Sequence, residues 1–143
     1  MRIRPSVGIR INALGKLVLV DTSIWIDYFR KQKRVYEELS RLMDETRICL
    51  ARLILAELIQ GAKSDREVTT LNDLPSVFRV LEEGPSTWEK AGLLSYRLKR
   101  QGKTASLGDC YIATLANENG VLLFTRDKDF EVIKAVVNLS LFS

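Results

Sequence analysis

The sequence predicts an α/β protein with one mostly parallel sheet of about five short strands, covered by helices on both faces. Short apolar runs typical of buried strands alternate along the chain with longer segments of helical periodicity. Helical connections between successive strands favour parallel pairing, which places the helices on the faces of the sheet. The length of 143 residues and the hydrophobic content of 46% fit a single domain with a sizeable core.

The first half of the chain begins with a basic segment and then alternates strand and helix. Residues 1–16 have no consistent apolar period, so we expect a poorly ordered extension before a domain that spans residues 17–143. The apolar run at 17–20 predicts a buried strand, and residues 21–23 offer capping side chains for the helix that follows. The other expected elements are helices at 24–29, 35–44, 53–62 and 65–74 and strands at 47–50 and 78–81.

The second half has clearer helix boundaries. Its expected elements are helices at 86–101, 106–118 and 127–137 and strands at 121–124 and 139–142. Gly102 and Gly120 follow the first two of these helices, as glycines that end helices do. The pattern Ser106-x-x-Asp109 matches a capping box at the start of the second helix. The alternation of strands and helices therefore continues to the end of the chain.

Composition limits the chemistry that this chain can carry out. It contains no histidine, which excludes the usual proton shuttle of serine and cysteine hydrolases and of metal-free ribonucleases. Cys49 and Cys110 lie in apolar segments without a C-x-x-C pairing, so we expect two buried free thiols. No stretch approaches the ~20 apolar residues of a membrane span, and we expect a cytoplasmic protein. Any hydrolysis must therefore depend on carboxylates, with a metal.

The positive net charge does not indicate a domain that binds nucleic acid as a whole. Four of the 22 basic residues lie in residues 1–16, which leaves 18 in residues 17–143, equal to the 18 acids there. Two local groups of basic residues remain candidates for contact with nucleic acid. The preference for cations at the ends of helices explains their positions equally well. They are Arg30, Lys31, Lys33 and Arg34, and Arg97, Lys99, Arg100 and Lys103.

Four acidic residues follow strands or interrupt apolar segments, and each has a structural alternative. Asp21 follows the first strand directly and Asp127 follows a later one, so both fall where parallel sheets bind ligands. Either could instead cap a helix. Glu57 interrupts an apolar helix, where its charge needs a partner such as a metal or an arginine. For Asp109 the alternative is that the capping box with Ser106 is its whole role.

If these acids converge, they could bind a divalent cation such as Mg²⁺ or Mn²⁺. Phosphodiester cleavage requires neutralisation of the phosphate, a nucleophile made from water and stabilisation of the leaving oxygen, and a hard cation held by carboxylates supplies all three. Crowded carboxylates resist ionisation, which a cation would relieve. The acids therefore predict hydrolysis of a phosphodiester by metal-activated water.

Two other functions remain open from these residues. An enzyme that forms a covalent aspartyl phosphate could also begin with an acid at a strand end, but it usually needs a second acid where this chain has Ser23. A non-catalytic RNA- or partner-binding module could use the acids only as helix caps. Stoichiometric binding of Mn²⁺ would distinguish a metal site from caps.

Four short motifs carry a resemblance to a known family. They are LVLVDTSIWI at 17–26, AELIQG at 56–61, GDCYIA at 108–113 and LFTRDKDF at 123–130. In this order and spacing they resemble the VapC family of PIN-domain toxins, over residues 17–143. The resemblance implies a PIN-like three-layer α/β/α sandwich and a metal-dependent endoribonuclease that cleaves structured RNA such as tRNA or rRNA.

The resemblance also implies roles for individual residues and for partners. The acids that match the family's metal site are Asp21, Glu57, Asp109 and Asp127, and the accessory positions are Ser23, Thr125 and Asp129. Of the two neighbouring acids, Asp127 is preferred over Asp129 as the metal ligand because it is nearer the strand end. The family further implies a cognate VapB-type antitoxin whose C-terminal segment blocks the site, and a homodimer. The basic extension at 1–16 is a departure that the family pattern does not need.

Overall fold

The structure, a computed structural model, describes residues 15–143 and has the predicted α/β fold. A sheet of four parallel strands runs in the order β3-β2-β1-β4. The strands are β1 (Val18–Val20), β2 (Ile48–Leu50), β3 (Arg79–Val80) and β4 (Leu122–Phe124). Most of the expected extension lies outside the described residues, so its order stays a prediction.

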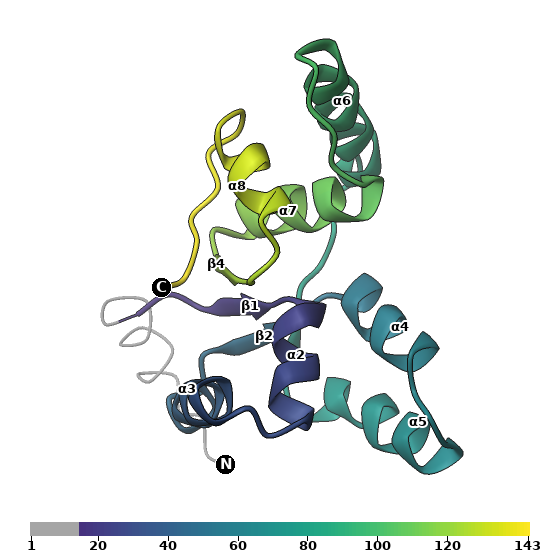
Figure 1. The fold of residues 1–143 in the computed structure, drawn as a ribbon, viewed down its shortest axis with the longest axis vertical. Helices are drawn as coiled ribbons and strands as arrows, with labels where there is room; N and C mark the ends of the chain where they lie inside the picture. Colours follow the sequence, from purple (N-terminus) through teal and green to yellow (C-terminus); the bar gives the residue numbers. More distant parts are fainter. Residues whose placement is uncertain (1–14) are drawn as a thin grey trace.

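Helices cover the sheet on both sides, as Figure 1 shows. The helices are α2 (Thr22–Phe29), α3 (Lys33–Asp44), α4 (Arg52–Gln60), α5 (Asp65–Asn72), α6 (Thr87–Arg100), α7 (Leu107–Asn119), α8 (Asp129–Lys134) and the 3-10 turn η1 (Leu74–Ser76). Helix α2 contacts α3 and α4, whereas α7 contacts α6 and α8. The predicted arrangement in three layers is therefore confirmed.

The two central strands, β1 and β2, are buried on both faces. All three residues of β1 are fully inaccessible to solvent, and all three of β2 are buried. A strand buried on both faces is a continuous apolar run and does not alternate with polar residues. The prediction of two buried free thiols is also confirmed, since Cys49 and Cys110 lie in this core.

Two elements near the C-terminus differ from prediction. The expected last strand at 139–142 is reduced to a single parallel bridge between Leu123 and Leu141. The expected helix at 127–137 is only the six residues of α8, because it begins after a turn in which Asp127 accepts a hydrogen bond. Within residues 15–143, no helix has both the length and the apolar character needed to cross a bilayer.

Candidate metal centre

The predicted acids gather at the carboxyl ends of two neighbouring strands. Asp21 follows β1 directly and occupies the N-cap position of α2. The segment that carries Asp127 follows β4, which pairs with β1 in parallel so that Val20 lies opposite Phe124. The backbone N–H of Asp21 donates to the carbonyl of Phe124 over 2.9 Å. Parallel pairing therefore brings together residues that are about a hundred positions apart in the chain.

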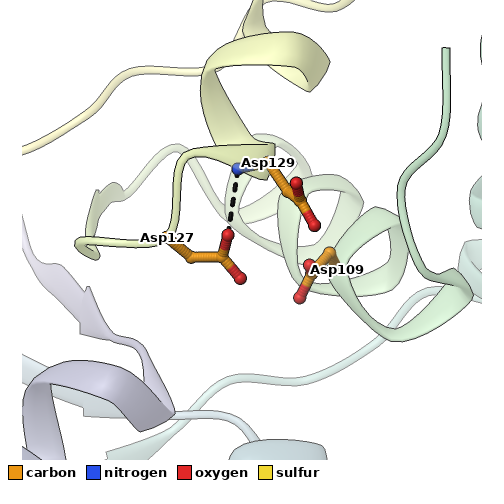
Figure 2. Close-up of side chains that lie close together, drawn as sticks. All are labelled: Asp109, Asp127 and Asp129. Atoms are coloured by element: carbon orange, nitrogen blue, oxygen red, sulfur yellow. Dashed lines mark hydrogen bonds between the residues drawn. The ribbon is translucent and has the colours of Figure 1, made fainter.

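Three carboxylates form the centre of the site. Asp109, Asp127 and Asp129 each have a side-chain oxygen within 4.8 Å of the other two. Asp109 comes from the first turn of α7, Asp127 from the turn between β4 and α8, and Asp129 from the start of α8, as Figure 2 shows. A divalent cation with oxygen ligands at 2.0 to 2.6 Å is of the size that such a group could hold.

Asp127 caps the start of α8 and also belongs to the group of three acids. Its Oδ1 accepts a hydrogen bond of 2.9 Å from the backbone N–H of Asp129, which fixes the start of α8. Its second oxygen is left for the centre, and Figure 2 shows the carboxyl group beside Asp109. Asp129 belongs to the same group of three, so both neighbouring acids are candidate ligands.

Asp21 is buried close enough to this group for its charge to raise the pKa of Asp109, and it is held by two hydroxyls. Only 6% of the residue is exposed. Its Oδ2 accepts hydrogen bonds from Thr125 Oγ1 at 2.8 Å and from Ser23 Oγ at 3.2 Å. Burial raises the pKa of Asp21, and the charge of Asp127 raises it further, although the two hydroxyls act in the opposite direction. The predicted accessory residues Ser23 and Thr125 are therefore in contact with a site acid.

Asp109 is the acid whose ionisation is most disfavoured by its surroundings. Burial, followed by the charges of Asp127, Asp21 and Asp129, raises the pKa of Asp109 to about 6. Its backbone N–H donates to Ser106 Oγ over 3.0 Å, which is one half of the predicted capping box. The capping role thus uses the backbone of Asp109 and leaves its carboxylate for the group of three.

Glu57 differs from the expectation in its burial. The buried residues of α4 are Ile54, Leu55 and Leu58, and Glu57 lies outside them on the exposed side. The interpretation that Glu57 needs a partner because it is buried is therefore wrong. Its Oε1 accepts a hydrogen bond of 2.6 Å from Thr22, the residue after Asp21. Glu57 is not one of the three clustered acids, but this bond ties it to the segment that carries Asp21.

The surroundings of the acids fit a cation. Among residues 15–143, no ion pair involves Asp21, Asp109, Asp127 or Asp129. Carboxylates that raise one another's pKa without a basic partner lack a compensating charge. Carboxylate oxygens are the ligands that Mg²⁺ and Mn²⁺ prefer. The donor set and its charge therefore suit a hard divalent metal ion.

Three residues that take part in this arrangement were missed from the sequence. Thr22 binds Glu57, and Arg126 forms a two-bond ion pair with Asp27 over 2.7 and 3.0 Å. Arg126 and Asp27 are 99 residues apart, and nothing in the sequence links them. The only available signal is their position, since each lies within six residues of a predicted site acid.

Comparison with known proteins gives a consistent result. The family model described as PIN domain matches residues 18–136. The chain is 36% identical over 128 residues to ribonuclease VapC11 of Mycobacterium tuberculosis, which covers 86% of this chain and 96% of that protein. It is 28% identical over 135 residues to ribonuclease VapC1 of Methanocaldococcus jannaschii, with 94% and 93% coverage.

Solved structures show the same fold. The DNA-bound VapBC structure from Salmonella typhimurium contains a chain with a TM-score of 0.72 and 23% identity, which covers 89% of this chain and 97% of that one. A chain of VapBC-1 from nontypeable Haemophilus influenzae has a TM-score of 0.71 and 22% identity, with 89% and 97% coverage. At these identities the likeness concerns the fold alone.

Proposed function

The chain belongs to the PIN-domain family, and on that premise we propose that it is a divalent-metal-dependent endoribonuclease that acts as the toxin of a toxin–antitoxin pair. The observation that carries the proposal is the group formed by Asp109, Asp127 and Asp129 beside the buried Asp21, with no basic residue paired to any of them in the described part of the chain. The names of the curated relatives, which are ribonucleases, agree with this activity.

The four aspartates would hold the metal, and Mg²⁺ and Mn²⁺ both suit their oxygens. When bound, the ion would neutralise charge on the scissile phosphate and lower the pKa of water near it. Thr125 and Ser23 fix the carboxylate of Asp21 by hydrogen bonds to its Oδ2. Thr22 fixes Glu57 at the edge of the site, where an exposed carboxylate can face substrate or solvent.

The substrate that we propose is structured RNA, such as tRNA or rRNA. Of the basic residues near the end of α6, Arg97, Lys99 and Arg100 lie in its last turn, where the helix dipole favours cations. Their position is therefore explained without RNA, and we assign them no contact with it. The proposed activity depends on the acids and not on a general basic surface.

We also propose a VapB-type antitoxin as partner and a homodimer as the assembly. Several of the structurally similar chains come from VapBC structures. Exposed apolar side chains on α6, among them Trp88, Leu93 and Tyr96, are consistent with a surface that self-associates. Sedimentation equilibrium of the purified chain tests the dimer, and co-purification with the product of a neighbouring small gene tests the antitoxin.

The replacement Asp21→Asn tests the proposed activity. It keeps the size of the side chain and removes the charge, so we expect cleavage of a tRNA substrate in Mn²⁺ to fall below detection while circular dichroism stays native. The matched control is Asp44→Asn, which removes an exposed acid at the end of α3. Chelation with EDTA should also stop cleavage by the wild-type chain. Undiminished cleavage by Asp21→Asn would contradict the proposal.

A further inference from the structure

A short turn between β4 and α8 carries Asp127 and leads directly to Asp129, the first residue of α8, and it is fixed by polar contacts to α2. Thr125 Oγ1 donates to the carboxylate of Asp21 and accepts from the backbone N–H of Asp127 over 3.0 Å. The backbone N–H of Arg126 donates to Ser23 Oγ over 3.4 Å. The position of Asp127 and Asp129 relative to Asp21 therefore depends on how this turn sits on α2.

The strongest contact between the turn and α2 is the ion pair of Arg126 with Asp27. Arg126 Nε lies 2.7 Å from Asp27 Oδ2, and Arg126 Nη2 lies 3.0 Å from Asp27 Oδ1. Two parallel bonds of this kind fix the orientation of a guanidinium as well as its distance. Ser23 and Asp27 are four residues apart on α2 and so share one face, which contacts Arg126 at both its backbone and its side chain.

Because the acids repel one another, the turn needs a contact that holds it in place. Side-chain oxygens of Asp109, Asp127 and Asp129 lie within 4.8 Å of one another, and like charges this close repel, so the ionised groups push the turn away from α7. A cation from the chain placed among the acids would oppose that force but would occupy the centre. Arg126 instead forms its two bonds with Asp27; the Asp27 side chain is 15% exposed and the Arg126 side chain is 59% exposed. The acids are thereby held close without being neutralised.

We propose that the Arg126–Asp27 pair is a positioning device for the metal centre, which holds the turn of Asp127 and Asp129 against α2. The inference rests on the proposed function for its consequence in catalysis, although the positioning itself needs no metal. The ion pairs of Arg41 contrast with it. Arg41 pairs with Glu38 and Glu45 within four residues of itself at the surface of α3, so it links no distant segments. Arg126 is a positioning residue, and it touches neither the metal nor the reacting phosphate.

Three variants of the full chain test the pair. Asp27→Asn removes one charge, Arg126→Lys keeps the charge and loses the two-bond geometry, and Arg41→Lys is the matched control at the surface of α3. We expect both variants of the pair to weaken Mn²⁺ binding about tenfold or more in isothermal titration, as loss of an outer partner of metal ligands does. The control should bind Mn²⁺ as the wild type does.

A second measurement makes the test independent of the metal. The amides of Asp127 and Asp129 are hydrogen-bonded within the turn, so loss of the pair should speed their hydrogen exchange in the metal-free protein. Unchanged exchange at both amides in Asp27→Asn and Arg126→Lys would overturn the proposal.

The kinetic pattern separates positioning from direct contact with RNA. If Arg126 binds a phosphate, Arg126→Lys should raise KM and change its salt dependence, while Asp27→Asn should leave Mn²⁺ binding as in the wild type. That pattern would overturn the proposal, which requires both variants to lower kcat alike. Absence of RNA cleavage by the wild-type chain would reject the proposed function, and the exchange rates would still decide the positioning role.

Discussion

Helix α7 carries an acid near each of its ends, and the two acids behave in opposite ways. Asp109 lies in the first turn, where the helix dipole favours a negative charge, and Glu118 lies in the last turn, where the dipole opposes one. The shifts run against the dipole. The pKa of Asp109 is raised to about 6, whereas the pKa of Glu118 is lowered. Local partners therefore outweigh the helix dipole at both ends.

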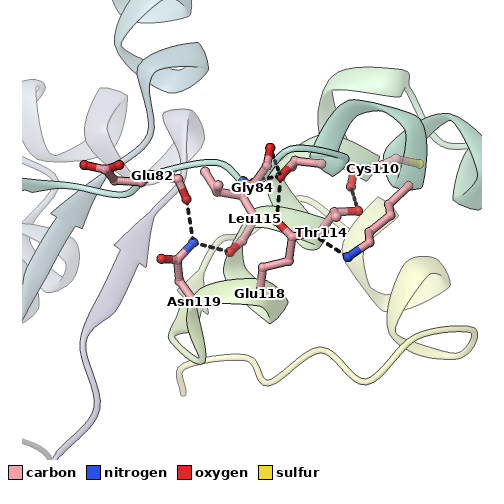
Figure 3. A network of polar contacts seen from close by, with 9 residues as sticks. Glu82, Gly84, Cys110, Thr114, Leu115, Glu118 and Asn119 are labelled. Carbon is pink, nitrogen blue, oxygen red and sulfur yellow. Dashed lines mark hydrogen bonds and ion pairs between the residues drawn. The ribbon is translucent and has the colours of Figure 1, made fainter.

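The partners of Glu118 explain its lowered pKa. Thr87 Oγ1 donates to Glu118 Oε1 over 2.6 Å, and Lys90 Nζ lies 3.1 Å from Oε2. Figure 3 shows this network, together with Asn119, which donates to the carbonyls of Glu82 and Leu115. The network ties the end of α7 to the segment that enters α6. An acid with partners of this kind is structural.

The compensation that Asp109 receives is weaker, because its hydrogen bond with Ser106 lowers its pKa by less than burial and charge raise it. Burial and three neighbouring aspartates raise its pKa, and no lysine or arginine forms an ion pair with it among residues 15–143. An arrangement that disfavours its own charged form is a recognised property of functional sites. The comparison indicates that one end of α7 is structural and that the other end carries an acid without a basic partner among the described residues, as the proposed metal site requires.

The largest expected difference between the two ends is their response to metal. Mn²⁺ at one hundred times its dissociation constant should stabilise the wild-type chain by about 2.7 kcal/mol, because it binds only the folded state. Asp109→Asn should lose most of this stabilisation, whereas Glu118→Gln should keep it. Urea unfolding with and without Mn²⁺ measures both. Equal loss of the metal response in the two variants would remove the distinction between the ends.

The next effect concerns stability without metal. Glu118→Ala leaves the hydroxyl of Thr87, a residue only 1% exposed, without its carboxylate acceptor, and should lower the free energy of unfolding by about 2 kcal/mol. Asp109→Ala removes a repelled charge and should not destabilise the metal-free chain. RNA cleavage by folded Glu118→Ala should match that of the wild type. If Asp109→Ala proves the more damaging to stability, the assignment of the structural end is wrong.

The sequence predicted where the central strands lie and which acids come near one another better than it predicted the contacts between side chains. Asp21 and Asp127 could be placed together because the carboxyl ends of parallel strands meet at one edge of the sheet. The sequence favoured Asp127 over Asp129 because it is nearer the strand end, but the conformation of the turn after the strand was unknown, and both acids join Asp109 in the structure. The exposure of Glu57 depends on how α4 is rotated about its axis. The apolar stripe in the sequence defines that rotation only to within a residue.

Contacts between side chains distant in sequence were not predictable at all. The Arg126–Asp27 pair and the bond from Thr87 to Glu118 join segments 99 and 31 residues apart. Each depends on how two helices or turns pack, and charges occur too often along the chain for one pair to be singled out. The same limit applies to the expected last strand. The apolar residues there could not show whether they form a full strand or only the single bridge at Leu141 that the structure has.

The smallest expected effect is in the pH dependence of stability, and its sign differs between the two ends of α7. The folded pKa of Asp109 is about 6, above its ordinary 3.8, so the folded state binds more protons between these values. Its repulsion is therefore present above pH 6 and is relieved as the pH falls towards 4. For Glu118 the folded pKa is lowered, so its stabilising contribution is present above its ordinary 4.5 and is lost as the pH falls below that value.

Lowering the pH from 7 to 5 should therefore stabilise the metal-free chain through Asp109 by about 1 kcal/mol, after allowance for solvent screening of a partly exposed group. Urea unfolding across this pH range should show a smaller increase in the free energy of unfolding for Asp109→Asn than for the wild type. For Glu118→Gln the increase should equal that of the wild type. Asp21 carries a shift of the same sign, so the double variant Asp21→Asn/Asp109→Asn should lose still more of the gain. If the double variant keeps the full gain, the repulsion that distinguishes the two ends lies elsewhere in the chain, and the acids at the strand ends are no more strained than ordinary surface carboxylates.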